Sequence, residues 1–159
     1  MTATTGIGWD SHRLVAGRPL ILGGVAIEHD LGLVGHSDAD ALTHAIIDAL
    51  LGAAAMGDIG QHFPDTDERY RDADSMLLLR TVVATLADQG LAIVHVDATV
   101  VMERPKLAPH RDAIRAALAD GLGVVPEHVN VKASTGEGMG FVGRGEGVAA
   151  LAVATLHSG

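Results

Sequence analysis

The sequence contains no cysteine among its 159 residues, which excludes disulfide bonds, thiolate metal ligands and thiol nucleophiles together. Any metal must therefore bind through histidine, aspartate or glutamate. Basic residues are also few: 11 Lys and Arg stand against 20 Asp and Glu, and the net charge of -9 argues against nucleic acid as a partner. Long apolar runs are missing too. His44 and Asp48 interrupt the most apolar stretch, residues 41–56, so we expect no membrane span and no membrane partner.

Aromatic residues are scarce, with one Trp, one Tyr and two Phe, which predicts an aliphatic core. With 48% hydrophobic residues the chain can still fold, and its length predicts one domain over residues 1–159. Residues 1–5 have neither the basic start nor the apolar segment of a secretory signal, so we expect a cytoplasmic location. The excess is in histidine, with nine residues, and histidine is the side chain that most often combines proton transfer with metal binding.

Hydrophobic periodicity divides the chain into strands and helices. Strands are predicted at residues 4–9, 91–102, 129–134 and 147–157. Residues 20–28 are also predicted to be extended, with an interruption at Gly23 and Gly24 that is either a hairpin turn or a bulge. Helices are predicted from a capping box at 37–40 to Gly57, over 74–89, and from Pro109 to about 120, with loops at 32–35, 57–74 and 136–147. This order predicts an α+β fold, a mixed β-sheet with helices packed on one face. Because the core is thin, we expect an oligomer.

Three side chains form the strongest candidate metal site. Asp10 and His12 are two residues apart at the predicted end of a strand, so both side chains should emerge on the same side. His44 lies inside the first predicted helix, where Asp40 and Asp48 share its face and Asp48 is a candidate to orient the ring. One carboxylate and two imidazoles, with a fourth position open, form the ligand pattern of catalytic zinc.

Two further segments carry phosphate-binding chemistry. His36 can donate to a phosphate while Ser37 caps the first helix, whose N-terminal N–H groups attract anions. Residues 136–145 are rich in glycine and include Arg144, but they lack the Gly-Lys-Ser/Thr ending of a P-loop. Each pattern also fits a simpler interpretation, in which Asp10 caps a turn and the glycines form a flexible connection. An acidic protein that binds polyphosphate requires a divalent cation, which favours metal-assisted phosphate chemistry.

Five segments of the chain, taken together, resemble one known protein family. They are GWDSH at 8–12, HSDAD at 36–40, DALLGAA at 48–54, GDIG at 57–60 with FPDTD at 63–67, and GRGEG at 143–147. In this order and spacing they resemble the 2-C-methyl-D-erythritol 2,4-cyclodiphosphate synthase family along nearly the whole chain. The sequence departs from the family at Ser134 and Gly136, where threonine is more common, and at Arg104, where a smaller residue is common.

The resemblance implies a homotrimer with active sites between subunits, and a phosphorus-oxygen lyase of non-mevalonate isoprenoid biosynthesis. The family cyclises a CDP-linked substrate, 4-diphosphocytidyl-2-C-methyl-D-erythritol 2-phosphate, to 2-C-methyl-D-erythritol 2,4-cyclodiphosphate and releases CMP. The implied zinc ligands are Asp10, His12 and His44, and a second divalent cation, Mg²⁺ or Mn²⁺, would sit on the substrate diphosphate with the help of Glu137. His36 and Thr135 match positions that stabilise the transition state. Arg144 and Glu146 match positions at the trimer axis, where a prenyl diphosphate can bind.

The remaining implied contacts all touch substrate. The resemblance places the methylerythritol part beside residues 58–67 and the cytidine in a pocket of residues 102–108 and 133–135. The full implied set is Asp10, His12, Ser37, Asp58, Ile59, Gly60, Phe63, Asp65, Asp67, Met102, Pro105, Lys106, Leu107, Ala108, Ala133, Ser134, Glu137, Phe141 and Arg144. Two alternatives use the same residues: a metal-dependent phosphohydrolase, and a non-catalytic sensor of nucleotides or prenyl phosphates.

Overall fold

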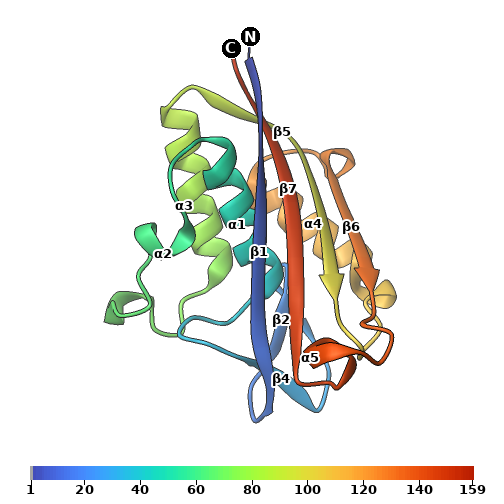
Figure 1. Cartoon of the computed structure of the whole chain (residues 1–159). Helices are drawn as coiled ribbons and strands as arrows, with labels where there is room; N and C mark the ends of the chain where they lie inside the picture. Colours follow the sequence, from blue (N-terminus) through green and yellow to red (C-terminus); the bar gives the residue numbers. More distant parts are fainter. Residues whose placement is uncertain (1) are drawn as a thin grey trace.

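A five-stranded mixed sheet with its three long helices on one side forms the fold in the computed structural model, which describes residues 2–159 (Figure 1). The strand order across the sheet is β4-β1-β7-β5-β6, and a separate hairpin pairs β2 with β3. The strands are β1 (Thr2–Ala16), β2 (Leu20–Leu22), β3 (Val25–Ile27), β4 (Leu31–Val34), β5 (Leu91–Val101), β6 (Val129–Ser134) and β7 (Gly147–Ser158). The α-helices are α1 (Ala41–Ala53), α2 (Ile59–His62), α3 (Ser75–Asp88), α4 (Arg111–Leu122) and α5 (Gly140–Gly143). Three 3-10 turns, η1 (Glu68–Tyr70), η2 (Ala108–His110) and η3 (Pro126–His128), complete the elements. The predicted α+β class with a mixed sheet is confirmed.

β1 and β7 form the long antiparallel centre of the sheet. Their register runs from Thr2 opposite Ser158 to Arg13 opposite Gly147, so the two chain ends lie side by side (Figure 1). β4 pairs antiparallel with the last residues of β1, and β5 pairs antiparallel with β7 and parallel with β6. The parallel pair requires a crossover, and η2 and α4 supply it.

α1 lies directly on β1 because the inward positions of this strand are glycines. A Cβ on Gly8 would lie 1.8 Å from the carbonyl oxygen of Ala45, and a Cβ on Gly6 would meet the backbone of the same helix at 2.1 Å. Alternate residues point to the opposite face, where Ile7 and Trp9 are 69% and 53% exposed. Glycines and large side chains therefore alternate between the two faces of this part of β1.

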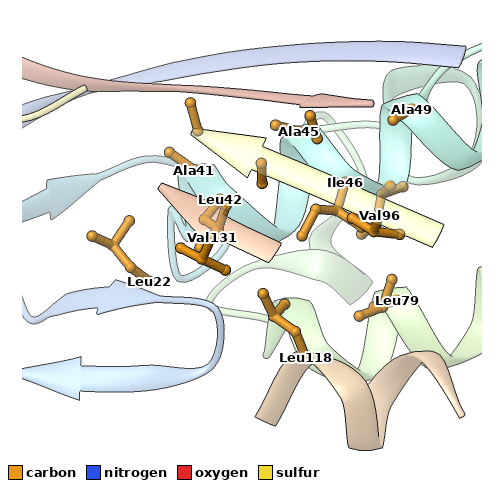
Figure 2. Packing of buried hydrophobic residues seen from close by; sticks show 14 of the residues in the cluster. Leu22, Ala41, Leu42, Ala45, Ile46, Ala49, Leu79, Val96, Leu118 and Val131 are labelled. Atoms are coloured by element: carbon orange, nitrogen blue, oxygen red, sulfur yellow. The ribbon is translucent and has the colours of Figure 1, made fainter. Parts of the chain in front are cut away.

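The core lies between the sheet and the three long helices, and it is aliphatic as predicted. Figure 2 shows Ile46 of α1 beside Val96 of β5, with Leu79 of α3 and Leu118 of α4 facing them, and all four side chains are fully buried. The four aromatic residues all belong to the described part of the chain, and none of them is buried. Within residues 2–159, no helix has the length and apolar character needed to cross a membrane.

The hairpin, α3, β5, β6 and β7 follow the predicted ranges closely, but two strand predictions were wrong. β1 does not end at Trp9 but continues to Ala16, because β7 and then β4 supply hydrogen-bonding partners along its polar half. Asp10 and His12 therefore lie inside the strand. Residues 31–34 form the edge strand β4 where a loop over 32–35 was predicted.

The first helix also begins later than the capping box predicts. Asp40, not Ser37, is the N-cap of α1, because the fully buried Asp40 carboxylate accepts from Thr43 N at 3.0 Å. In α3, Asp74 is the N-cap, accepting from Met76 N, which agrees with the predicted start. The long loops contain the short helices α2 and α5, which local sequence patterns did not predict.

Candidate active site

Two neighbouring elements position the three candidate metal ligands. Asp10 and His12 follow Gly6 and Gly8 on the inward face of β1, where the strand passes beyond the close contact with α1. His44 projects from the first turns of α1 toward them. One ligand atom from each residue lies within 4.8 Å of the other two, and within residues 2–159 no other group of three such residues meets this limit. The predicted convergence of these three side chains is confirmed.

The ligand atoms face one another at short range. Asp10 Oδ2 lies 2.8 Å from His12 Nε2 and 3.2 Å from His44 Nδ1. Asp10 Oδ2 and His12 Nε2 are both buried and have no hydrogen bond of suitable geometry. Burial alone would raise the pKa of Asp10, but the two imidazoles beside it outweigh burial and hold this pKa below its ordinary value. An ionised carboxylate and two converging ring nitrogens fit a divalent cation such as zinc.

The remaining nitrogen of each imidazole is held by the protein. His12 Nδ1 lies 3.1 Å from the carbonyl oxygen of Val34 at the end of β4, and His44 Nε2 lies 2.7 Å from Ser75 Oγ at the start of α3. Such outer contacts orient metal-binding histidines. Asp48, the predicted orienter of His44, instead accepts from Ile59 N at 2.7 Å, because α2 folds back over this face of α1. That prediction was wrong.

A cavity of about 420 Å³ opens beside the candidate metal site. Its wall combines His12 and His44 with residues before α1 and residues of the 57–74 connection. The lining residues are His12, Gly35, His36, Ser37, His44, Ile59, Gly60, Phe63, Pro64, Asp65, Tyr70 and Leu78. A lining that combines imidazole, hydroxyl and backbone groups with two aromatic rings suits a small phosphorylated ligand with an apolar part.

Comparison with known proteins shows the family of this chain. The YgbB family profile matches residues 3–157. The chain belongs to the YgbB family. The 2-C-methyl-D-erythritol 2,4-cyclodiphosphate synthase of Salinibacter ruber is 61% identical over 153 residues, which cover 96% of this chain and 98% of that protein. The synthase of Laribacter hongkongensis is 59% identical over 158 residues, covering 99% and 98%.

Solved structures of similar proteins have the same fold. A 2-C-methyl-D-erythritol 2,4-cyclodiphosphate synthase in its CDP-bound form superposes with a TM-score of 0.89 at 38% identity, covering 96% of this chain and 99% of that one. The bifunctional IspDF of Campylobacter jejuni gives 0.94 at 41% identity. That match covers 98% of this chain but 42% of the longer bifunctional chain.

The N-terminus of α1 is not the open phosphate-binding site that the sequence predicts. The Asp40 carboxylate occupies the N-terminus of α1, accepting from Thr43 N and from both glycine N–H groups of the β2–β3 turn. The Thr43 N–H, one of the groups expected to be free for an anion, is therefore already used, and a negative charge already lies at this helix end. His36 Nε2 lies 2.9 Å from the carbonyl oxygen of Asp67, and donation to that oxygen leaves Nδ1 as the nitrogen available to a ligand. Ser37 Oγ contacts His44 Nε2 at 3.2 Å instead of capping the helix.

The predicted methylerythritol side falls largely within the first cavity. Ile59, Gly60, Phe63 and Asp65 line it. Asp58 caps α2 by accepting from Gln61 N at 3.0 Å and is exposed outside this lining. Asp67 caps η1 and pairs with Arg69, and these contacts with Arg69 hold the pKa of the Asp67 carboxyl below its ordinary value.

A second cavity, of about 340 Å³, gathers the residues of the predicted cytidine pocket. Backbone pairing of Met102 N with Ser134 O at 2.9 Å brings the ends of β5 and β6 together. The lining residues are Met102, Glu103, Pro105, Lys106, Leu107, Ala108, Arg111, Ala133, Ser134, Thr135 and Glu137. Glu137 N donates to Thr135 Oγ1 at 3.1 Å, which connects the glycine-rich loop to this pocket.

The two cavities lie apart on a single chain. His36 follows β4 and Thr135 follows β6, and these strands are the opposite edges of the sheet. Four strand spacings separate them, or roughly 19 Å. Glu137 likewise lies with Thr135 and not with the Asp10, His12 and His44 cluster. One chain therefore does not bring the two predicted catalytic residues together.

Phe141 and Arg144 lie in and directly after α5, at the turn into β7. Phe141 lines a smaller hollow that also includes His12. Arg144 pairs with Glu146 at 3.0 Å, which raises the pKa of the Arg144 guanidinium and lowers that of the Glu146 carboxyl. The pair is exposed to solvent.

Sequence reasoning missed several residues of both cavities. Tyr70 stands edge-on to Phe63, with ring centroids 5.3 Å apart, and Glu103 and Arg111 line the second cavity. Ser75 was missed as well. Its contact with His44 could not be predicted from the sequence, because the two residues are 31 positions apart and meet only when α3 packs on α1.

Proposed function

We propose that the chain is a 2-C-methyl-D-erythritol 2,4-cyclodiphosphate synthase. In this reaction the 2-phosphate of 4-diphosphocytidyl-2-C-methyl-D-erythritol 2-phosphate attacks the β-phosphorus, one new P–O bond closes the ring, and the bond to CMP breaks. The observation that carries the proposal is the convergence of Asp10, His12 and His44 beside a cavity in a YgbB-family chain that is 61% identical to such a synthase. No protein nucleophile is required, because the attacking group belongs to the substrate.

The donor set favours zinc at this site. Asp10, His12 and His44 would hold the ion, and Glu137 would help to hold Mg²⁺ or Mn²⁺ on the diphosphate. When bound, such ions neutralise phosphate charge and polarise the reacting phosphorus as Lewis acids. The buried, unpartnered Asp10 Oδ2 and His12 Nε2 support a cation at the first position.

The residues of the chain act mainly by folding the substrate back on itself. The pocket of Lys106, Ala133 and Ser134 would hold the cytidine, and Phe63 with its neighbours would hold the methylerythritol part. Fixing both ends presents the 2-phosphate to the β-phosphorus, and such intramolecular alignment can lower a barrier by about 7–11 kcal/mol. His36 and Thr135 would stabilise the charge that develops in the transition state.

A homotrimer would complete this site. His36 and Thr135 follow opposite edge strands of the sheet, roughly 19 Å apart on one chain, so a substrate that contacts both requires the second cavity of a neighbouring subunit. The face of the sheet opposite α1, α3 and α4 exposes Ile7, Trp9 and Val153, which supports its burial against other subunits. Arg144 and Glu146 near this assembly's axis would receive a prenyl diphosphate. Residues 1–159 would form the single domain of each subunit, and a cytoplasmic location stays a prediction.

Release of CMP from the CDP-linked substrate, with and without a metal chelator, tests the proposed function. We expect release that the chelator abolishes and added zinc restores, with the cyclic diphosphate as the second product. Solvent labelled with oxygen-18 separates the alternatives, because hydrolysis incorporates solvent oxygen and cyclisation does not. Labelled product would indicate a phosphohydrolase, and ligand binding without CMP release would indicate a sensor. Either outcome would refute the cyclase.

A further inference from the structure

Ser75 connects the loop before α1 to one of the candidate metal ligands. It is the first residue of α3 and is fully buried. Its hydroxyl contacts the Asp38 carboxylate at Oδ1 on one side and lies 2.7 Å from His44 Nε2 on the other. Asp38, Ser75 and His44 thus form a continuous chain of polar contacts that ends at the metal-facing imidazole.

The hydrogen-bond donors and acceptors of Asp38, Ser75 and His44 allow only one placement of the protons. Asp38 Oδ2 accepts from Ser75 N at 3.0 Å, and Oδ1 accepts from Asp40 N at 3.1 Å, so this carboxylate is surrounded by donors. A carboxylate only accepts hydrogen bonds, and the Ser75 hydroxyl must therefore donate to it. Its single proton is then used, and Ser75 Oγ can only accept from His44. His44 consequently carries its proton on Nε2.

We infer that Asp38 and Ser75 are positioning residues that hold His44 in the Nε2–H tautomer and so keep the Nδ1 lone pair directed at the metal. The inference rests on the proposed metal site. The second imidazole follows the same rule with a different partner, because His12 Nδ1 donates to the Val34 carbonyl and leaves Nε2 free. Both free nitrogens are the ones that converge on Asp10.

The Asp38 and Ser75 contacts also explain how a segment distant in sequence supports the site. Asp38 N donates to the carbonyl of Ala73 at 3.1 Å, so the loop before α1 and the start of α3 are joined by backbone as well as side-chain contacts. Ser37 Oγ approaches the same His44 nitrogen at 3.2 Å, but it also accepts from Ala39 N. Ser75 Oγ is closer to His44 Nε2 than Ser37 Oγ is, and its own proton is already donated to Asp38.

Ser75→Ala tests the inference through zinc affinity. This substitution removes the hydroxyl and leaves the backbone contact of residue 75 with Asp38 intact. We expect zinc to bind about 10–100-fold more weakly, as for other outer-shell partners of metal-binding histidines. Asp74→Ala is the matched control, because it removes the cap of the same helix without touching His44. Zinc affinity in Ser75→Ala within twofold of wild type, or an equal loss in Asp74→Ala, would overturn the inference.

Nitrogen-15 NMR of the zinc-loaded protein reads the tautomer directly, because without the ion the Asp10 carboxylate, 3.2 Å from His44 Nδ1, would itself favour a proton on that nitrogen. We expect the wild-type His44 ring to carry its proton on Nε2, and Asp38→Asn to increase the Nδ1–H form. An amide can donate to the Ser75 hydroxyl, which then donates to His44 Nε2. A wild-type ring protonated on Nδ1 would refute the positioning role. Zinc binding with the expected tautomer but no CMP release would refute the proposed cyclase and leave the positioning role intact.

Discussion

Gly8→Ala should separate the helix that carries His44 from the strand that carries Asp10 and His12. The new Cβ would lie 1.8 Å from the Ala45 carbonyl oxygen, whereas real Cβ contacts essentially never fall below 3.0 Å. The obstacle is backbone, so no side-chain rotation relieves it, and α1 must move by about 1.2 Å or the strand must bend. Overpacking of this kind costs about 1–3 kcal/mol, and we expect the upper end of that range.

The displacement should reach the metal site because His44 directly precedes Ala45. His44 Nδ1 lies 3.2 Å from Asp10 Oδ2, and metal sites require their ligands to be held within about 0.5 Å. We therefore expect the zinc affinity of Gly8→Ala to fall at least about tenfold together with the free energy of unfolding. Urea denaturation measures the stability, and competition with a chromophoric chelator measures the affinity.

Gly52→Ala is the matched control on the same helix. Its Cβ would lie 3.7 Å from Gly6 Cα, an ordinary contact, and alanine is favoured over glycine in helices by up to about 1 kcal/mol. This variant should keep its zinc affinity and be equally or slightly more stable. A Gly8→Ala protein with wild-type stability and zinc affinity would refute the close-packing argument.

Three further substitutions test separate parts of the argument. His44→Ala should abolish zinc binding and CMP release while the circular dichroism spectrum stays native, and a fully active zinc-free variant would contradict the metal assignment. Asp40→Asn should lower the free energy of unfolding, measured in urea, by about 1–3 kcal/mol, because an amide cannot accept all four hydrogen bonds that the buried carboxylate receives. Unchanged stability would show that these hydrogen bonds are dispensable. Partial burial raises the pKa of Asp97, but hydrogen bonds from Lys132 and Asn130 outweigh it and hold this pKa below the ordinary 3.8. The ionised Asp97 carboxylate thus stabilises the fold above pH 3.8, and this contribution is lost as the pH falls below that value. Lys132→Met should therefore make the free energy of unfolding depend less steeply on pH between about pH 2 and 6.

The fold class could be predicted because its signals are local. Periodicity of apolar residues marked α3, β5, β6 and β7, and the glycine pair at 23–24 indicated a hairpin turn or a bulge, of which the structure has the turn. The boundaries of β1 could not be predicted, because its polar second half is extended only by pairing with β7 and β4. The start of α1 was misplaced for a similar reason, since Asp40 is buried by the hairpin and outcompetes Ser37 as a cap.

The composition and spacing of this chain determined which groups could bind a metal. Without cysteine, only carboxylates and imidazoles remained, and alternation along a strand put Asp10 and His12 on one side. The tertiary structure decided which group orients His44. Asp48, on the same helix as His44, accepts a hydrogen bond from α2 instead. The group that contacts the His44 ring is Ser75 of α3, more than thirty positions away in the sequence. It also decided that His36 and Thr135 lie at opposite edges of the sheet. Local spacing constrains the direction of a side chain within one element, whereas the approach of different elements depends on how their buried faces pack.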